Sequence, residues 1–212
     1  MTATAIDAIV RDGPVIAVVT IESAADAVPL AKALCAGGIR VIEVTLRSEA
    51  ALEAIERIAA DAGNAIVGAG TARSARDIAV ACAAGARFVV SPGFTPSLDT
   101  AARRANAAWL PGVATASEIL LAQEAGRSVL KFFPAESSGG TRALAAFATV
   151  FPDVRFCPTG GVTEKNLRAY LDQPNVVCAG GTWVAPRDAV AGRDWQKIQL
   201  LADQAVATGS AS

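Results

Sequence analysis

The fold is predicted from residues 39–63, which read IRVIEVTLRSEAALEAIERIAADAG. The first part, residues 39–46, is rich in β-branched residues and predicts a buried strand. After Ser48, a predicted N-cap, apolar residues recur at helical spacing as far as Gly63. Glycine is the residue that most often ends a helix in the left-handed conformation. The segment therefore predicts one strand followed by one helix.

The same strand–helix unit recurs along the whole chain. Ser74 and Gly85, for example, flank a second amphipathic segment in the same way as Ser48 and Gly63. Strands that alternate with helices pair in parallel through right-handed crossovers. The predicted strands are residues 14–21, 39–46, 65–71, 87–92, 108–113, 128–135, 154–161 and 175–182.

Eight such units predict an α/β protein with a (β/α)8 TIM barrel, preceded by an extra N-terminal helix at about residues 3–12. A doubly wound open sheet is the alternative, but no GxGxxG follows the first strand, as nucleotide-binding sheets of that kind require. No linker interrupts the pattern. We therefore predict a single barrel domain over residues 1–212, with residues 207–212 as a frayed tail.

Composition narrows the classes of function. The chain has 212 residues, 52% of them hydrophobic, and a formal net charge of −1. Without a basic surface, nucleic acid and anionic membrane are poor partners. No apolar run is long enough to span a bilayer, and the first residues do not resemble a secretory signal. The four scattered cysteines are typical of reduced thiols, so we predict a cytoplasmic protein.

The chain contains no histidine. Its absence excludes Ser-His-Asp and Cys-His catalysis, together with every metal site that needs an imidazole ligand. Any proton transfer must therefore use a carboxylate, a lysine or a tyrosine.

Alternation along residues 41–47 places polar side chains on one face of the second strand. Glu43, Thr45 and Arg47 point one way, while Ile42 and Val44 point the other. In a barrel the apolar face packs on helices, so the polar face lines the interior and its mouth. A buried Glu–Arg ion pair that serves only the structure is the alternative interpretation.

The stretch LKFFPAE, residues 130–136, places a lysine inside a predicted strand. By the same alternation Lys131 and Phe133 face the barrel, because Leu130 and Phe132 pack on helices. Lysine is seldom fully buried unless it is paired or used in chemistry. Lys131 is then either a structural partner of Glu43 or a nucleophile, since burial favours the free amine that forms Schiff bases. Glu43 is the candidate general acid and base.

The last two predicted strands each end in a glycine pair beside a threonine, TGG at 159–161 and GGT at 180–182. Barrel enzymes often bind phosphate in the loops after strands seven and eight, where glycine allows close approach of backbone N–H groups. Tight turns without a ligand are the alternative. The stretch GAGT, residues 68–71, places Thr71 at the same end of the barrel.

Several stretches together resemble the 2-keto-3-deoxy-6-phosphogluconate (KDPG) aldolase family, the class I aldolases of the Entner–Doudoroff pathway. KFFPAE (131–136) and RFCPTGGV (155–162) are the most specific of them. The other matching stretches are GIRVIEVTLRS (38–48), GAGT (68–71), SPGF (91–94), LPGVATASE (110–118) and CAGGTWVAP (178–186).

The resemblance implies a metal-independent lyase with no cofactor, built as a barrel and assembled as a homotrimer. It implies that Lys131 forms the Schiff base and that Glu43 is the general acid and base. The family's remaining roles fall on two sets of residues. Substrate contacts fall on Arg47, Thr71, Pro92, Phe133 and Thr159, and phosphate contacts fall on Gly160, Gly161, Gly181 and Thr182.

The sequence departs from the family pattern at three places. Thr182 replaces a common serine, residues 72–74 read ARS where the family often has VLN, and Phe94 replaces a frequent leucine. The hydroxyl at position 182 is retained, so phosphate binding is still expected.

The predicted function is cleavage of KDPG to pyruvate and glyceraldehyde 3-phosphate. Three alternatives remain open at this stage. They are an aldolase for unphosphorylated 4-hydroxy-2-oxoglutarate (KHG), a phosphate-binding isomerase or synthase that uses Glu43 as base, and a non-catalytic or engineered assembly subunit.

Overall fold

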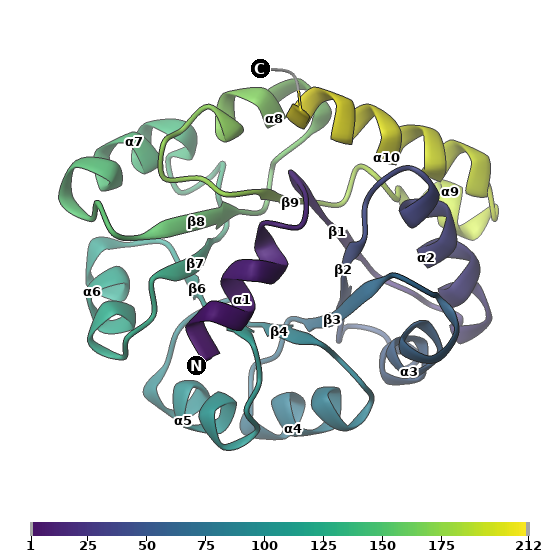
Figure 1. The fold of residues 1–212 in the computed structure, drawn as a ribbon, viewed down its shortest axis with the longest axis horizontal. Coiled ribbons are helices and arrows are strands. Elements are labelled where there is room, and N and C mark those ends of the chain that lie inside the picture. The colour runs from purple at the N-terminus through teal and green to yellow at the C-terminus, as the bar shows by residue number, and fades with distance from the viewer. Residues whose placement is uncertain (1, 211–212) are drawn as a thin grey trace.

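Parallel strands and covering helices alternate through residues 2–210, which are the residues described in the computed structural model (Figure 1). The strands are β1 (Val15–Val19), β2 (Val41–Thr45), β3 (Ile66–Gly70), β4 (Phe88–Val90), β5 (Trp109–Leu110), β6 (Gly112–Val113), β7 (Val129–Phe132), β8 (Arg155–Pro158) and β9 (Ala179–Gly181). The helices are α1 (Thr2–Val10), α2 (Ala27–Ala36), α3 (Ala51–Asp61), α4 (Ala75–Ala83), α5 (Pro96–Arg104), α6 (Ala116–Glu124), α7 (Gly140–Val150), α8 (Glu164–Leu171), α9 (Arg187–Ala191) and α10 (Trp195–Ser210), with a 3-10 turn η1 (Ala24–Asp26).

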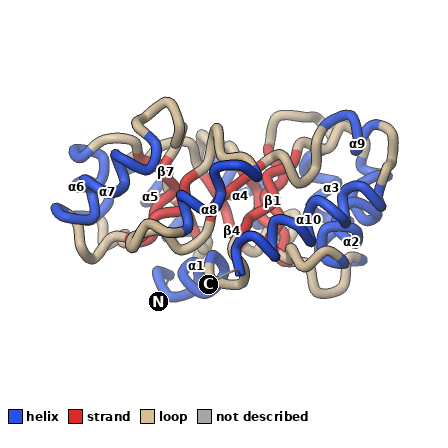
Figure 2. Tube along the Cα trace, turned by 90° about the horizontal axis from the view of Figure 1, so that it is seen from above, coloured by secondary structure: helices blue, strands red, loops and turns tan. Residues whose placement is uncertain are grey.

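The strands pair in two parallel sheets, in the orders β5-β4-β3-β2-β1-β9 and β6-β7-β8. Isolated parallel bridges join Phe156 to Val176 and Thr159 to Gly180, which brings β8 beside β9. Figure 1 shows the strands around a common centre with the helices outside them. Figure 2, turned by 90°, shows the strands in the middle of the molecule and α1 below them. The predicted parallel α/β class is confirmed.

The predicted strand at residues 108–113 is two short strands in the structure. Pro111 separates β5 from β6, because proline has no N–H to donate to a ladder. β5 pairs with β4, whereas β6 pairs with β7, so Leu110–Pro111–Gly112 connects the two sheets.

Some of the helices begin at a side chain that accepts a hydrogen bond from a backbone N–H group. Ser74 caps α4 as predicted, because its hydroxyl accepts from the backbone N–H of Asp77 at 3.1 Å. The prediction that Ser48 caps α3 is wrong, since Ala50 holds that position. Ser48 instead donates its hydroxyl to the carbonyl of Ile21 at 2.6 Å, which ties the end of β2 to the end of β1.

The two faces of the strands pack against different partners. Outward residues such as Ile42 and Phe132 belong to the main core with the surrounding helices. Inward residues near the amino ends of the strands form a second cluster with Ile6 and Val10 of α1. Helix α1 therefore covers the amino end of the strands (Figures 1 and 2), which leaves the carboxyl end as the accessible one.

The predicted fraying of residues 207–212 does not hold for residues 207–210, which form the end of α10. Residues 211 and 212 lie outside the described residues. None of the helices in the described part of the chain combines the length and the apolar character needed to cross a membrane.

Candidate active site

A cavity of about 430 Å³ opens at the carboxyl ends of the strands. It brings together nine of the predicted site residues from widely separated parts of the chain, and two further residues complete its wall. The lining consists of Val18, Glu43, Arg47, Thr71, Arg73, Pro92, Lys131, Phe133, Thr159, Gly160 and Thr182. We refer to it as the catalytic cavity.

Lys131 and Glu43 meet in the wall of this cavity, although 88 residues separate them in sequence. Lys131 Nζ donates to Glu43 Oε1 at 3.1 Å and lies 3.4 Å from Oε2. Both side chains are buried, at 7% and 4% exposure. The alternation predicted from the sequence produces this meeting, since Leu130 and Phe132 on the opposite face of β7 pack in the outer core.

Lys131 differs from the other lysines in its burial. Lys32, Lys165 and Lys197 are all exposed to solvent, whereas Lys131 exposes only 5% of its surface. The ring of Phe133 lies beside the amine, with Nζ 5.3 Å from the ring centroid. At this distance the ring face attracts a cation and excludes water from one side of the amine.

Two features of the GAGT stretch shape the site. A side chain at Gly70 would overlap the carboxylate of Glu43, so glycine at this position makes room for the acid. Thr71 has φ of +62°, a conformation that β-branched residues rarely adopt and that is found at functional sites. Thr71 was predicted as a site residue from the sequence, whereas Gly70 was not. The role of Gly70 depends on the pairing of β2 with β3, which places it beside Thr45 and which the sequence does not specify.

The other polar residues of β2 separate in the structure. Thr45 is fully buried and its hydroxyl lies 2.8 Å from that of Thr20, so it joins β1 to β2 without lining the cavity. Arg47 lies at the exposed mouth and has no carboxylate within 4.0 Å among the described residues. The predicted Glu43–Arg47 structural pair therefore does not form, because Glu43 pairs with Lys131.

The glycines of the last two loops differ in position, because one lines the catalytic cavity and the others pack behind it. Gly160 lines the catalytic cavity, and its φ of +95° favours glycine. Gly161 and Gly181 are absent from the lining: Gly161 packs against Glu136, and the ring of Trp183 covers Gly181. A side chain at Gly180 would overlap the hydroxyl of Thr159.

Glu136, the last residue of KFFPAE, holds the loop at Gly161 from behind. Its carboxylate accepts from Tyr170 Oη at 2.7 Å and from Asn166 Nδ2 at 3.1 Å. Asn166 Nδ2 also donates to the carbonyl of Gly161 at 3.0 Å. Burial, and then the hydrogen bond to Glu136, raise the pKa of Tyr170 above its ordinary value, so the phenol remains a donor.

Two residues of the cavity wall were not predicted from the sequence. Val18 lies on the inward face of β1, and alternation along that strand was enough to place it there. Arg73 follows Thr71 and adds a second guanidinium to the mouth. Its backbone N–H donates to Asp77 at 2.8 Å.

Four free cysteines are present, none at the mouth of the cavity. Cys178 is fully buried, and the hydrogen bond to Cys157 together with burial raises the pKa of its thiol. Burial likewise raises the pKa of Cys35 and Cys82. The thiols of Cys35, Cys82 and Cys178 therefore stay protonated at neutral pH and are poor nucleophiles. Within residues 2–210 no group of three or more carboxylates and thiols is placed to hold a metal ion.

The fold and the cavity together define a parallel α/β protein with a buried lysine–carboxylate pair at the carboxyl ends of its strands. Residues 6–201 match the family model described as "Aldolase: KDPG and KHG aldolase". This chain belongs to the KDPG/KHG aldolase family.

Individual relatives cover nearly the whole chain. The 2-dehydro-3-deoxy-phosphogluconate aldolase of Pseudoalteromonas atlantica is 52% identical over 195 residues, covering 92% of this chain and 91% of that protein. The KDPG aldolase of Zymomonas mobilis ZM4, solved with 3-phosphoglycerate, has a TM-score of 0.91 at 48% identity, covering 96% and 95%. The KDPG aldolase of Legionella pneumophila, solved with pyruvate captured at low pH as a covalent carbinolamine, has a TM-score of 0.93 at 42% identity, covering 95% and 98%.

Proposed function

We propose that this protein cleaves KDPG to pyruvate and glyceraldehyde 3-phosphate through a Schiff base on Lys131. The observation that carries the proposal is the hydrogen bond between Lys131 Nζ and Glu43 Oε1 in the wall of the catalytic cavity. A buried amine next to a carboxylate combines a nucleophile with the base that activates it. The carbinolamine captured in the Legionella relative supports this chemistry.

The first half of the reaction forms the imine. Lys131 gives a proton to Glu43, and its free amine attacks the C2 carbonyl of KDPG to form a carbinolamine. Glu43 then protonates the departing hydroxyl, water leaves, and a protonated imine remains. Because no histidine exists in the chain, the carboxylate 3.1 Å from the amine is the group best placed for both transfers.

The second half breaks the carbon chain. Glu43 removes the proton from the C4 hydroxyl, the C3–C4 bond breaks, and its electron pair moves into the imine to form an enamine. Glyceraldehyde 3-phosphate leaves. Protonation of the enamine at C3 and hydrolysis of the resulting imine release pyruvate and restore Lys131.

The remaining predicted residues take binding roles in the proposal. Arg47 binds the pyruvyl carboxylate, because a guanidinium recognises two oxygens at once. Thr71, Pro92 and Thr159 surround that carboxylate, and Phe133 packs beside the imine.

The phosphate lies at the glycine loops. Gly160 and Thr182 face the catalytic cavity, and backbone N–H groups can donate to an anion there. Gly161 and Gly181 shape the same loops from behind, through their contacts with Glu136 and Trp183.

The finer architecture is part of the same proposal. The two sheets form one closed barrel of eight parallel strands with α1 as an extra helix, and residues 1–212 form a single domain. Chain continuity through Pro111 and the bridge from Thr159 to Gly180 support closure. The protein is a cytoplasmic homotrimer and a class I aldolase, and Lys131 supplies the electron sink without a metal or organic cofactor.

A second candidate substrate is KHG, which the same imine chemistry would cleave. The family description, which names both activities, favours considering it. KHG lacks the phosphate and ends in a carboxylate. Relative kcat/KM values on the two substrates decide between them.

The test is trapping of the imine with sodium borohydride and pyruvate, followed by intact mass measurement and peptide mapping. We expect one reduced adduct on Lys131, none in Lys131→Ala, and normal labelling in the exposed control Lys165→Ala. An unlabelled wild-type protein would overturn the proposal. Together with an active isomerase or synthase assay, that result would favour the alternative in which Lys131 acts only as a charge. A well-folded oligomer without any activity would indicate an assembly subunit.

A further inference from the structure

The charged side chains that line the catalytic cavity carry an excess of positive charge. Lys131 is paired with Glu43. Among the described residues, Arg47 and Arg73 have no carboxylate within 4.0 Å, and both are exposed at the mouth. The mouth therefore carries two unpaired cations, although the net charge of the whole chain is −1. Arg47 has a role in the proposed function, whereas Arg73 has none.

The backbone around Arg73 is held by hydrogen bonds to neighbouring segments. Just before it, the N–H of Ala72 donates to the carbonyl of Val90 at 3.0 Å. The N–H of Arg73 itself donates to Asp77 Oδ2 at 2.8 Å, and the N–H of Asp77 donates to the Ser74 hydroxyl at 3.1 Å. The carboxylate of Asp77 thus accepts from the backbone, while the side chain of Arg73 lines the catalytic cavity.

Arg73 lies on the same side of the cavity as Arg47. They follow the ends of two paired strands, β2 and β3, where the N–H of Leu46 donates to the carbonyl of Gly70 at 2.9 Å. β8, which ends before Gly160, is separated from β3 by β2, β1 and β9 in one direction. In the other direction β4, β5, β6 and β7 lie between them. Figure 1 accordingly shows β3 and β8 on opposite sides of the common centre, so Arg73 lies across the cavity from the glycine loops.

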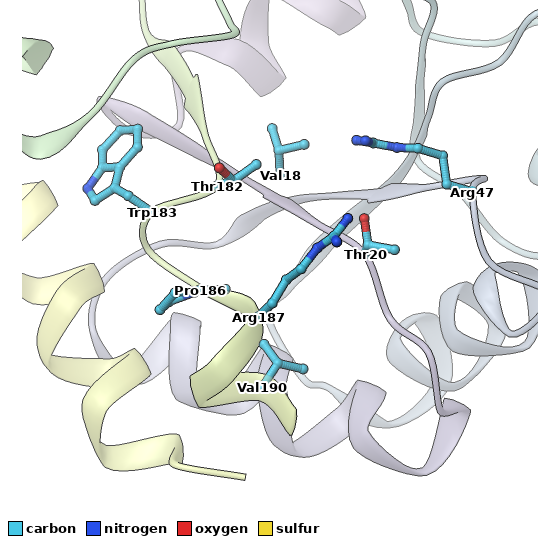
Figure 3. Close-up of a pocket in the computed structure, with 9 residues that line it drawn as sticks. Val18, Thr20, Arg47, Thr182, Trp183, Pro186, Arg187 and Val190 are labelled. Carbon is cyan, nitrogen blue, oxygen red and sulfur yellow. The ribbon is translucent and has the colours of Figure 1, made fainter. Parts of the chain in front are cut away.

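A further arginine near the site, Arg187, belongs to a neighbouring cavity of about 350 Å³. Figure 3 shows Arg187 rising into it from α9, while Arg47 reaches in from the other side. Arg47 lines both cavities, whereas Arg187 is absent from the lining of the catalytic cavity. Arg187 also lines a smaller cavity of about 190 Å³. Of the described arginines, only Arg47 and Arg73 therefore line the catalytic cavity.

We infer that Arg73 is a second guanidinium for the carboxylate of the pyruvate half of the substrate. Through this contact it selects charged 2-oxo acids over uncharged ketones. The inference rests on the proposed function, in which that carboxylate lies at Arg47 and Thr71 and the phosphate lies across the cavity. A carboxylate offers about four lone-pair positions, so it can accept from two guanidinium groups at once.

The residue at position 73 also departs from the family pattern. Residues 72–74 read ARS where the family often has VLN, so the arginine stands in the place of a leucine. A leucine at the mouth has no polar group that could donate to an anion. Arg73→Leu therefore removes the contact with the carboxylate by introducing a residue that is common in the family.

The experiment measures the pyruvate concentration at which the initial rate of borohydride labelling of Lys131 is half-maximal. In Arg73→Leu we expect this concentration to rise about fivefold, because water and salt weaken an ion pair at an exposed mouth. Arg73→Lys should raise it less, since lysine keeps the charge but not the planar donors. With methyl pyruvate, whose ester carries no charge, the wild type and Arg73→Leu should give the same value.

Steady-state kinetics on KDPG provide a second measurement. The same carboxylate is bound before and during the reaction, so Arg73→Leu should raise KM by about the same factor and leave kcat nearly unchanged. A loss of kcat with an unchanged KM would contradict a role in binding the carboxylate.

The matched control is Arg76→Leu, which makes the same substitution at an exposed position of α4. Arg76 does not line the catalytic cavity, so the control should leave the half-maximal pyruvate concentration unchanged. The inference is wrong if Arg73→Leu keeps the wild-type value, if it shifts methyl pyruvate by the same factor, or if the control has an equal effect. In each of these cases Lys131 is still labelled, whereas a wild-type protein without labelling would overturn the proposed function.

Discussion

Two buried ion pairs in this molecule have similar geometry and different surroundings. Lys131 pairs with Glu43 at 3.1 Å, and Arg127 pairs with Asp99 at 2.7 Å. All four residues are buried. Burial and pairing alone therefore do not distinguish a candidate catalytic pair from a structural one.

The surroundings make the difference. Arg127 lies over the ring of Trp109, 5.4 Å from its centroid, and Asp99 also accepts from Arg103 Nε at 2.7 Å. None of these residues lines the catalytic cavity or the two cavities nearest to it. The pair connects α5 to the segment before β7.

The Lys131–Glu43 pair instead faces a cavity, and its cation is an amine that can lose its proton. A lysine can lose its proton and attack a carbonyl, whereas a guanidinium remains charged in proteins. Access to a ligand and the chemistry of the cation therefore distinguish the candidate catalytic pair from the structural one. Three predictions test the difference between the two pairs, beginning with the largest effect.

Glu43→Gln should lower aldolase turnover by about 10²–10⁴-fold, because the variant loses its general acid and base. The amide is nearly isosteric, so Lys131 should still give a trappable adduct with pyruvate. Steady-state kinetics on KDPG and borohydride trapping measure the two properties separately. Normal turnover would show that another group moves the protons. The cost in folding stability should be small, because Lys131 can become a neutral amine beside a cavity that admits water.

Asp99→Asn should lower the free energy of unfolding by about 3 kcal/mol, because the buried Arg127 keeps its charge without a counterion. Activity per folded molecule should not change, since Asp99 does not line the catalytic cavity. Urea unfolding measures the stability. Asp172→Asn, in the exposed pair with Arg168, is the control and should cost less than about 1 kcal/mol. Equal losses in the two variants would contradict the structural role of the buried pair.

Gly70→Ala should reduce kcat by about tenfold, because the new methyl group displaces the carboxylate of Glu43 while leaving its charge in place. The variant separates the position of the acid from its presence. Gly13→Ala is the control, since a side chain at Gly13 meets nothing within 4 Å and the backbone there is not left-handed. Unchanged kinetics in Gly70→Ala would mean that Glu43 tolerates displacement.

Some features escaped prediction because they depend on contacts between distant segments. Ser48 had the pattern of an N-cap, yet its hydroxyl donates to Ile21, a partner that only the packing of β2 beside β1 provides. Pro111 was included within one strand, although its missing N–H divides that strand between two sheets. The contacts of Gly161 with Glu136 and of Gly181 with Trp183 also escaped prediction, because no local pattern indicates them. The phosphate contacts of the two glycines stay a prediction.

Composition and side-chain alternation alone predicted the parallel α/β class, the inward faces of the second and sixth predicted strands, and the restriction of proton transfer to residues other than histidine. These properties are local, because side-chain alternation and composition need no knowledge of neighbouring strands. The pairing of Lys131 with Glu43, the space that Gly70 leaves for that acid, and the position of Arg187 beside Arg47 around a second cavity became known from the three-dimensional structure. Such distances arise when strands far apart in sequence are brought together by the packing of the helices around them.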